Sequence, residues 1–206
     1  MTMITRRHLL AAGSALAGLS VLPVSAFAVD IAEFNKAPDL GEMSLGAEES
    51  KVTLTEYASA TCPHCAAFHS ETYGKLKAEY IDSKKIKFVF REFPHQPAAV
   101  AAFMLARCAP KEKYFPLIDV FFTTQPEWTQ DPLAGLGKIA QQAGFTKESF
   151  DACMKNEAVA KDILAVRTKA EGFGVTGIPT FFVNGERYQG ENTIEAFRAK
   201  IDPLLM

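Results

Sequence analysis

Two cysteines separated by two residues, Cys62-Pro63-His64-Cys65, lie where a predicted strand meets a predicted helix. The strand, Val52 to Tyr57, is rich in β-branched and aromatic residues, and apolar residues then recur at helical spacing over 62–81. Cys62 is therefore expected at the exposed start of a helix, where free N–H groups and the helix dipole favour an anion. The thiolate is the nucleophilic form of cysteine, so the motif predicts a thiol–disulfide exchange site.

Two other interpretations of the motif remain open. Cys62, His64, Cys65 and His69 include the side chains that zinc prefers, although no second Cys or His pair follows at a typical spacing. The two cysteines could also form a purely structural disulfide, although closing so small a loop gains little stability. We expect no metal site, and we give no catalytic role to His69 or His95, each of which is expected to be a surface histidine or a residue at the rim of the groove.

Residues 1–28 are typical of an export signal. Arg6 and Arg7 precede the apolar run from Leu9 to Val24, and Ala26-Phe27-Ala28 resembles a small-x-small cleavage site. Cleavage after about Ala28 would start the mature chain at Val29, and the protein is then expected in the periplasm. An uncleaved anchor is the alternative. The paired arginines resemble the twin-arginine signal, but general secretory signals also contain such pairs, so the export route stays open.

The charge of the mature chain excludes some classes of partner. The leader contains two of the 22 Lys and Arg residues and none of the 24 Asp and Glu residues, which leaves a net charge of −4. No basic patch indicates binding to nucleic acid or to a membrane surface. The remaining 178 residues suit one domain, or one domain with a sizeable insertion, and we expect a monomer.

The two other cysteines, Cys108 and Cys153, lie in predicted helical segments among apolar residues. An even number of cysteines in an exported protein permits two disulfides. We predict a structural disulfide between Cys108 and Cys153, with two separate buried thiols as the alternative.

The order of strand and helix signals predicts the fold class. The elements expected before residue 97 are a polar lead-in over 29–44 ending in an edge strand at 42–45, the strand 51–57, the helix 62–81 and the strand 86–93. No strand pattern appears from 97 to about 172, where helices are predicted over 97–109, 111–123, 131–143, 147–154 and 156–171. The elements expected after the block are a strand at 179–183, a hairpin turn at Asn184-Gly185, a return strand at 187–189 and a helix over 192–202.

Two segments carry a resemblance to a known family. The segment from Thr55 to His69, which contains Cys-Pro-His-Cys, and Gly177-Ile178-Pro179-Thr180-Phe181-Phe182-Val183-Asn184-Gly185 strongly resemble the DsbA-like periplasmic disulfide oxidoreductases. The resemblance implies an α/β thioredoxin fold with an inserted helical domain. Residues 29–96 and 172–206 would form the thioredoxin-fold domain, and 97–171 the insertion. Cys108 and Cys153 indicate a subgroup with a second disulfide.

Further site residues follow from this resemblance. His64 is expected to add an N–H donor and partial positive charge near the Cys62 thiolate, or else to be a solvent-facing loop residue. Pro179 resembles the family's cis-proline, which would present the backbone around Ile178 and Thr180 to an extended substrate; an ordinary trans proline is the alternative.

Glu56 would relay the proton of Cys65, with Lys87 on the adjacent strand as its charge partner. The alternative is an exposed glutamate at the end of the strand.

The function expected from all of this is that of an exported dithiol oxidase. It would donate the Cys62–Cys65 disulfide to unfolded or newly exported cysteine-containing proteins through a Cys62 mixed disulfide that Cys65 resolves. No cofactor is expected, and a membrane partner would reoxidise the pair. The alternatives are a disulfide isomerase or reductase, against which residues 29–41 count as too few for the usual dimerisation domain, and a non-catalytic peptide-binding module.

Overall fold

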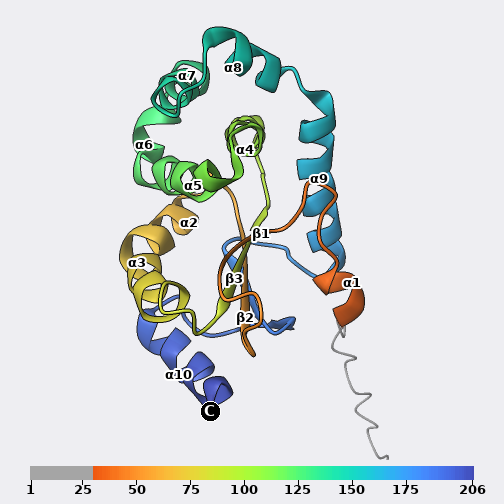
Figure 1. Cartoon of the computed structure of the whole chain (residues 1–206), viewed down its shortest axis with the longest axis vertical. Coiled ribbons are helices and arrows are strands. Elements are labelled where there is room, and N and C mark those ends of the chain that lie inside the picture. The colour runs from red at the N-terminus through yellow and green to blue at the C-terminus, as the bar shows by residue number, and fades with distance from the viewer. Residues whose placement is uncertain (1–29) are drawn as a thin grey trace, which may run out of the picture.

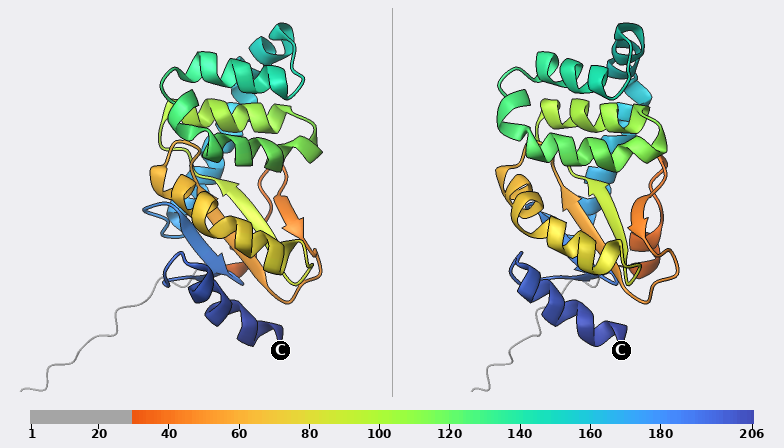
Figure 2. Two further views of the ribbon diagram at one scale, coloured as in Figure 1. Left: turned by 90° about the vertical axis from the view of Figure 1, so that its left-hand side faces the viewer. Right: turned by 60° about the vertical axis from the view of Figure 1, so that its left-hand side comes forward.

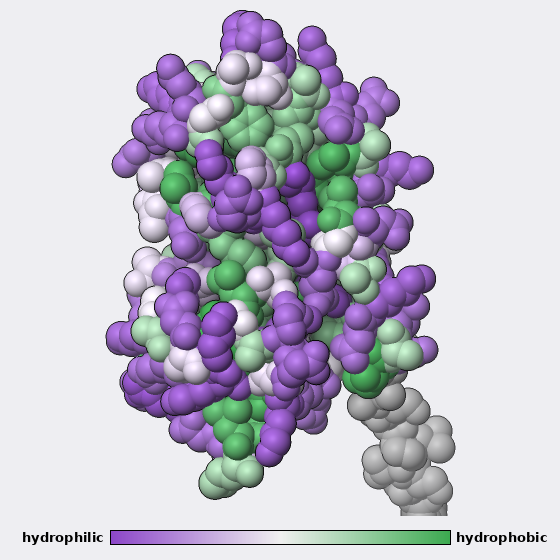
Figure 3. Space-filling model, viewed as in Figure 1, coloured by the Kyte–Doolittle hydropathy of each residue, from purple (hydrophilic) through white to green (hydrophobic). Residues whose placement is uncertain are grey.

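The computed structural model describes residues 30–206. The predicted leader, residues 1–28, and its cleavage site lie outside the described residues. No helix within 30–206 combines the length and the apolar character needed to span a membrane. Hydrophilic residues cover most of the face shown in Figure 3, and apolar residues form separate patches on it.

A mixed sheet of five strands lies at the centre of the lower half of the molecule (Figure 1). The strands are β1 (Met43–Gly46), β2 (Thr53–Ala58), β3 (Lys87–Glu92), β4 (Thr180–Val183) and β5 (Glu186–Arg187), in the spatial order β1-β3-β2-β4-β5. β2 and β3 are parallel and joined through a helix, as predicted, and every other pairing is antiparallel. The strand order places β2, which leads into the cysteine motif, in the middle of the sheet.

Side-chain alternation along the strands explains the two faces of this sheet. Leu54 and Ala58 of β2 belong to the main hydrophobic core, whereas Tyr57 belongs to a smaller cluster on the opposite face. In β4, Phe181 packs in the main core and Phe182 in the smaller cluster. Successive strand residues point to opposite faces, so other elements must pack on both faces to bury these apolar side chains.

The first cover is a long helix over Pro63–Ile81, which includes two π-helical stretches. Its parts are α2 (Pro63–Phe68), the π turn His69–Tyr73, α3 (Gly74–Leu76) and the π turn Lys77–Ile81. α10 (Ile194–Leu205), capped by the Thr193 side chain, lies beside it (Figure 2). Both helices were predicted, and α10 continues three residues beyond its predicted end at 202.

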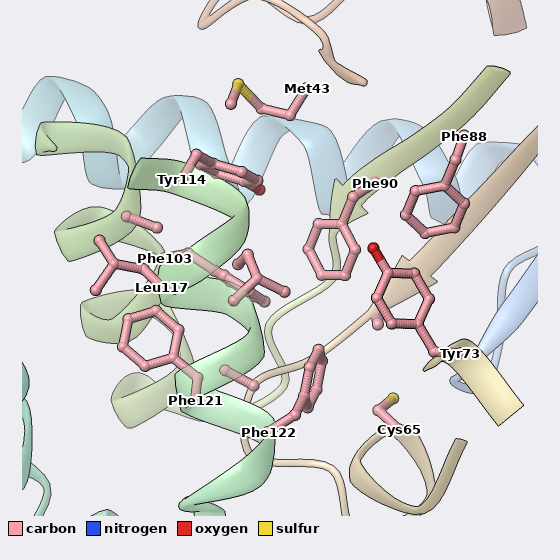
Figure 4. Close-up of a cluster of buried hydrophobic side chains, with 14 of the residues drawn as sticks. Met43, Cys65, Tyr73, Phe88, Phe90, Phe103, Tyr114, Leu117, Phe121 and Phe122 are labelled. Carbon is pink, nitrogen blue, oxygen red and sulfur yellow. The ribbon is translucent and has the colours of Figure 1, made fainter. Parts of the chain in front are cut away.

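The inserted block lies at the top of the molecule in Figure 1 and consists of helices. They are α4 (Pro97–Cys108), a 3-10 turn (Lys111–Lys113), α5 (Tyr114–Thr123), α6 (Gln125–Trp128), α7 (Pro132–Gln142), α8 (Lys147–Met154) and α9 (Glu157–Gly172). Figure 4 shows side chains of this block, including Phe103, Leu117 and Phe121, beside Phe88 and Phe90 of the sheet. One continuous core therefore joins the block to the sheet.

α9 extends past the block and covers the second face of the sheet. Ile163 near its middle packs in the main core, whereas Ala170 near its end joins Phe34, Tyr57 and Phe182 in the smaller cluster. Arg167 donates from NH1 to the carbonyl of Pro94 at 2.9 Å. The predicted boundary at 171 thus falls within a helix that contacts both parts.

Two short helices were missed by the prediction. α1 (Ile31–Asn35), capped by the Asp30 side chain, lies in the segment expected to be a polar lead-in, and its one buried residue is Phe34. α6 (Gln125–Trp128) is a single turn. Neither helix is long enough to show a periodic pattern of apolar residues. Helices of this length also depend on tertiary packing for their stability.

Candidate functional site

The cysteine motif occupies the corner where β2 ends and α2 begins. Cys62 is the N-cap of α2, with extended backbone angles (φ −86°, ψ 119°), and Pro63 follows at the first helical position. Proline is favoured there because its fixed φ suits a helix start. The Cys62 N–H donates to the carbonyl of Ser59 at 3.0 Å, and the Cys62 carbonyl accepts from Ala66 at 3.1 Å. The corner holds the Cys62 Sγ next to the free N–H groups of the first helical turn.

The two cysteines differ less in exposure than predicted. Pro63 and His64 are exposed, but Cys62 is only 6% exposed and Cys65 is fully buried. The expectation that Cys62 is an exposed residue is therefore wrong, because neighbouring segments cover its backbone and much of its side chain. Both are free thiols.

The environment shifts the two thiols in opposite directions. A hydrogen bond from the Cys65 thiol, followed by the backbone N–H groups of Cys65 and His64, lowers the pKa of Cys62 to about 5. Burial raises the pKa of Cys65 far above its usual value, and the hydrogen bond to Cys62 and the charge of Glu56 act in the same direction. One sulfur is thus held as a thiolate and the other as a thiol at neutral pH.

Two histidines affect Cys62, and the first acts differently from the prediction. His64 supports the thiolate through its backbone N–H, and its imidazole is not among the main groups that stabilise it. The charge of the exposed His95, which follows β3, also lowers the pKa of Cys62. His95 is therefore a residue of the site's rim, which sequence reasoning considered and then left without a role.

The loop before β4 faces Cys62. The Ile178–Pro179 peptide bond is cis. The Cys62 Sγ is 3.6 Å from the carbonyl oxygen of Ile178, which can accept its hydrogen only when Cys62 is protonated. Thr180 is buried, and its hydroxyl donates to the carbonyl of Gly177 at 2.6 Å. A hollow beside this loop is lined by Pro179, Thr180, Phe181, Arg187, Tyr188, Gln189, Gly190 and Asn192.

Glu56 is fully buried, so the alternative of an exposed glutamate does not apply. The prediction of Lys87 as its charge partner is wrong: Lys87 is level with Thr53 in the sheet register and pairs with Glu42 at 3.0 Å and Glu48 at 2.7 Å. The actual partner is His69, whose Nε2 is 3.1 Å and 3.2 Å from the two carboxylate oxygens.

The sequence did contain a signal for His69. It follows Cys65 by four residues on the same helix and therefore shares the buried helix face with Cys65. Its side chain is 4% exposed, so the expectation of a surface histidine is wrong.

Gln125 of α6 is a site residue that sequence reasoning missed. It is buried, and its side-chain amide donates to the carbonyl of Ala60 at 2.8 Å and to that of Cys62 at 3.1 Å. Its only sequence signal is a glutamine in a turn 63 residues away from Cys62. It ties the inserted block to the cysteine corner.

The second cysteine pair lies within the block. Cys108, the last residue of α4, forms a disulfide with Cys153 of α8, with 6.0 Å between the Cα atoms. Across residues 30–206, no three His, Cys, Asp or Glu side chains gather in a way that could hold a metal ion. His69, which was considered as a zinc ligand, instead directs its Nε2 at the carboxylate of Glu56.

Comparison with known proteins identifies the family. A family model described as Thioredoxin matches residues 39–203. A Rickettsia bellii protein whose name assigns it, provisionally, as a protein-disulfide oxidoreductase is 37% identical over 171 residues, which is 80% of this chain and 64% of the relative. A Rickettsia conorii protein of the same description is 33% identical, over 81% of this chain and 61% of the relative. The chain thus spans less than two thirds of the length of these relatives.

Solved structures agree with this assignment. The crystal structure of Wolbachia pipientis alpha-DsbA1 has a TM-score of 0.77 at 27% identity, covering 84% of this chain and 95% of that one. A structure described as a protein-disulfide isomerase from Novosphingobium aromaticivorans has a TM-score of 0.73 at 25% identity, covering 82% and 99%. The chain has the thioredoxin fold with an inserted helical domain, and it belongs to the thioredoxin family as a DsbA-like member.

Proposed function

We propose that the protein is a protein-disulfide oxidoreductase that works as a dithiol oxidase, donating its Cys62–Cys65 disulfide to exported proteins. The observation that carries this proposal is the opposite shift of the two thiols. A pKa of about 5 for Cys62 makes the reduced pair more stable at pH 7 than an ordinary dithiol by about 2–3 kcal/mol. For a two-electron couple, this energy corresponds to a disulfide that is roughly 60 mV more oxidising.

The exchange proceeds through a mixed disulfide. A substrate thiolate attacks the Cys62 Sγ, the bond between Cys62 and Cys65 breaks, and Cys65 leaves as a thiolate that takes up one proton. A second substrate thiolate then attacks the substrate sulfur and releases Cys62 as a thiolate. This role was expected of Cys65 above, but attack by Cys65 would return the substrate to its reduced form. The substrate loses two electrons and the cysteine pair gains two. The low pKa of Cys62 favours this second step because a stable thiolate is a good leaving group.

The loop around the cis-proline is proposed as the substrate site. An extended peptide would lie against Ile178, Pro179 and Thr180, next to the Cys62 Sγ, and could pair with the backbone there. His64 acts through its backbone N–H on the Cys62 thiolate, and Glu56 acts as the proton relay for Cys65. Cys108 and Cys153 are outside this chemistry and have a structural role.

The cellular setting is part of the proposal. The protein is exported to the periplasm as a monomer, meets cysteine-containing proteins as they arrive, and is reoxidised by a membrane partner. No cofactor takes part, because electrons pass between sulfur atoms. The predicted leader over residues 1–28 and the structural disulfide both support an oxidising compartment.

A disulfide isomerase or reductase is the second candidate, and the description of the Novosphingobium neighbour favours it. The redox potential of the Cys62–Cys65 pair, measured by equilibration with glutathione, separates the two. An oxidase gives a potential clearly above that of the glutathione couple; a potential below it would favour a reductase. A non-catalytic peptide-binding module predicts no acceleration of insulin reduction by dithiothreitol, with Cys62→Ser as the inactive control.

A further inference from the structure

The buried imidazole of His69 is held between the carboxylate of Glu56 and two aromatic rings. Its Nε2 lies 3.1 Å and 3.2 Å from the two oxygens of Glu56, and both side chains are almost completely buried. The ring stacks on Phe122 with 4.0 Å between centroids and 23° between planes, and it packs against Tyr73 at 4.4 Å and 36°. In the orientation with these contacts, the ring directs Nε2 at the carboxylate.

The backbone of the helix connects His69 to Cys65. The His69 N–H donates to the carbonyls of Cys65 and Ala66, so His69 is one turn further along the same helix face. Figure 4 shows Cys65, Tyr73 and Phe122, from α2, the π turn and α5, converging on one part of the core. A π-helical stretch begins at His69, and such turns often occur at functional positions.

Cys65 needs a proton source at this depth. When the disulfide opens, Cys65 leaves as a thiolate, yet the side chain is fully buried, and both burial and the Glu56 charge disfavour its ionised form. Water does not reach a sulfur in such a position easily, so a neighbouring group must deliver the proton. The charge of Glu56 acts on Cys65, and its partner His69 lies one helical turn beyond Cys65, so this titratable pair is the candidate for that group.

We propose that His69 is a positioning residue that holds the Glu56 carboxylate through its Nε2, so that the pair can pass a proton to the Cys65 thiolate when the disulfide opens. This inference rests on the thiol–disulfide exchange proposed above. In the oxidised protein the pair holds one extra proton and is neutral overall. When the substrate thiolate attacks Cys62, this proton moves to the Cys65 sulfur, and the carboxylate that remains accepts the Nε2–H of a neutral His69.

The physical reason lies in the burial of the carboxylate. A buried carboxyl without a partner holds its proton to high pH and is a poor donor at neutrality. An N–H donor at about 3 Å stabilises the carboxylate that forms when the proton leaves. The Nδ1 atom of His69 is buried and lacks a hydrogen-bond partner among residues 30–206, which disfavours a permanent imidazolium and keeps the extra proton transferable.

The other titratable groups facing the pair come from three elements. They are Cys65 of α2, Tyr73 of the π turn and Asp119 of α5. Burial raises the pKa of Asp119, whereas charge on His69 and Lys77 lowers it. Burial also raises the pKa of Tyr73, so its hydroxyl stays neutral throughout the relevant range. Within residues 30–206, the His69 ring hydrogen-bonds to Glu56 and to none of these three groups.

The test is the opening of the Cys62–Cys65 disulfide by excess glutathione in single-turnover experiments between about pH 5 and pH 10. The rate constant is divided by the fraction of glutathione that is ionised. In the unmodified protein this corrected rate should fall in one step, by at least roughly tenfold, as the pair loses its proton. In His69→Phe the unpartnered Glu56 keeps its proton longer, so the midpoint should move up by more than one pH unit.

Three further variants make the result decisive. Tyr73→Phe keeps the stacking and should leave the midpoint unchanged, whereas Glu56→Gln should abolish the step. Since His69→Phe leaves a buried carboxyl unpartnered, the double variant Glu56→Gln/His69→Phe serves as a folded reference and should also lack the step. A midpoint that stays in place in a folded His69→Phe protein would overturn the inference and leave His69 a packing residue. A protein that does not exchange with glutathione at any pH would instead overturn the proposed function.

Discussion

The two cysteine pairs of this protein show how position determines what a pair of sulfurs does. Cys62 and Cys65 lie two residues apart at a helix start, and hydrogen bonds and burial shift their pKa values in opposite directions. Cys108 and Cys153 are separated by 45 residues and join two helices of the inserted block. The first pair is tuned for exchange by its surroundings, and the second restricts the unfolded chain.

The difference follows from loop size and from neighbours. In the chain-entropy model, a loop of 45 residues stabilises the folded state by about 3–4 kcal/mol, whereas a loop of four residues contributes about 2 kcal/mol. The Cys62 thiolate stabilises the reduced form, and this offsets the stabilisation that the four-residue disulfide loop gives the oxidised form. Cys153 has no such neighbours: its sulfur lies 3.2 Å from the carbonyl of Met104 in an apolar core.

Alkylation should reveal the largest difference, and it lies within the first pair. Near pH 6 a thiol with a pKa of about 5 is mostly ionised, whereas Cys65 is a buried thiol. Iodoacetamide should therefore modify Cys62 faster than Cys65 by at least ~10³-fold. The rates are measured by mass spectrometry of the reduced protein. Comparable rates at the two sulfurs would remove the assignment of Cys62 as nucleophile.

Removing the Cys108–Cys153 disulfide should lower the stability of the fold but leave the reactivity of Cys62 unchanged. Cys108→Ala/Cys153→Ala should lower the free energy of unfolding by about 3–4 kcal/mol in urea titrations, since the unfolded chain loses its constraint. The alkylation rate of Cys62 should stay within about twofold of its original value, because the pair is remote from the corner. If the Cys62 rate collapsed while the protein remained folded, the two regions would not be separable in this way.

Gln125 tests the contact between the block and the corner. Gln125→Met leaves the carbonyls of Ala60 and Cys62 without their buried donor and should cost about 1–3 kcal/mol. It should also slow exchange at Cys62. Gln130→Met is the matched control, because Gln130 donates to the carbonyl of Pro126 from an exposed position and should cost less than about 0.5 kcal/mol. Equal losses of stability in the two variants would show that the corner gains nothing from Gln125.

The smallest expected effect is the most diagnostic for the first pair. The folded pKa of Cys62 is depressed, so its stabilisation is complete above the unfolded pKa and disappears as pH falls through about 5. At pH 7 about 2–3 kcal/mol remains, which exceeds the loop term of about 2 kcal/mol by roughly 1 kcal/mol. The reduced protein should therefore melt slightly above the oxidised one at pH 7, and at pH 5 the oxidised protein should melt higher.

This comparison needs the second pair held constant, most simply in the Cys108→Ala/Cys153→Ala background. Melting temperatures of both redox forms at the two pH values check it by calorimetry. An oxidised form that melts higher at pH 7 in that background would make the Cys62–Cys65 disulfide a stabilising crosslink.

Much of the fold could be predicted because long periodic segments carry a strong signal. The helix 147–154 was predicted with its observed bounds, and 97–109 and 156–171 differ by one residue at most at each end. Single turns such as α1 and α6 could not be predicted, since tertiary contacts alone stabilise them.

At the site, local signals located the cysteine corner and the loop at Pro179, because both are short motifs with fixed chemistry. Contacts between residues far apart in the sequence could not be predicted, because they depend on the sheet register and on how the helices pack. The family resemblance implied Lys87, on the adjacent strand, as the partner of Glu56, but the sheet register places Lys87 level with Thr53. Gln125 reaches the corner from a helix that the sequence did not indicate.

The path of α9 has a consequence for dividing the protein. Because one helix begins in the inserted block and ends on the second face of the sheet, the block is not a detachable module. Excising residues 97–171 would remove Ala170 and expose the aromatic rings of Phe34, Tyr57 and Phe182. A minimal thioredoxin-sized derivative of this chain would therefore need a newly designed helix over those three rings before it could remain soluble on its own.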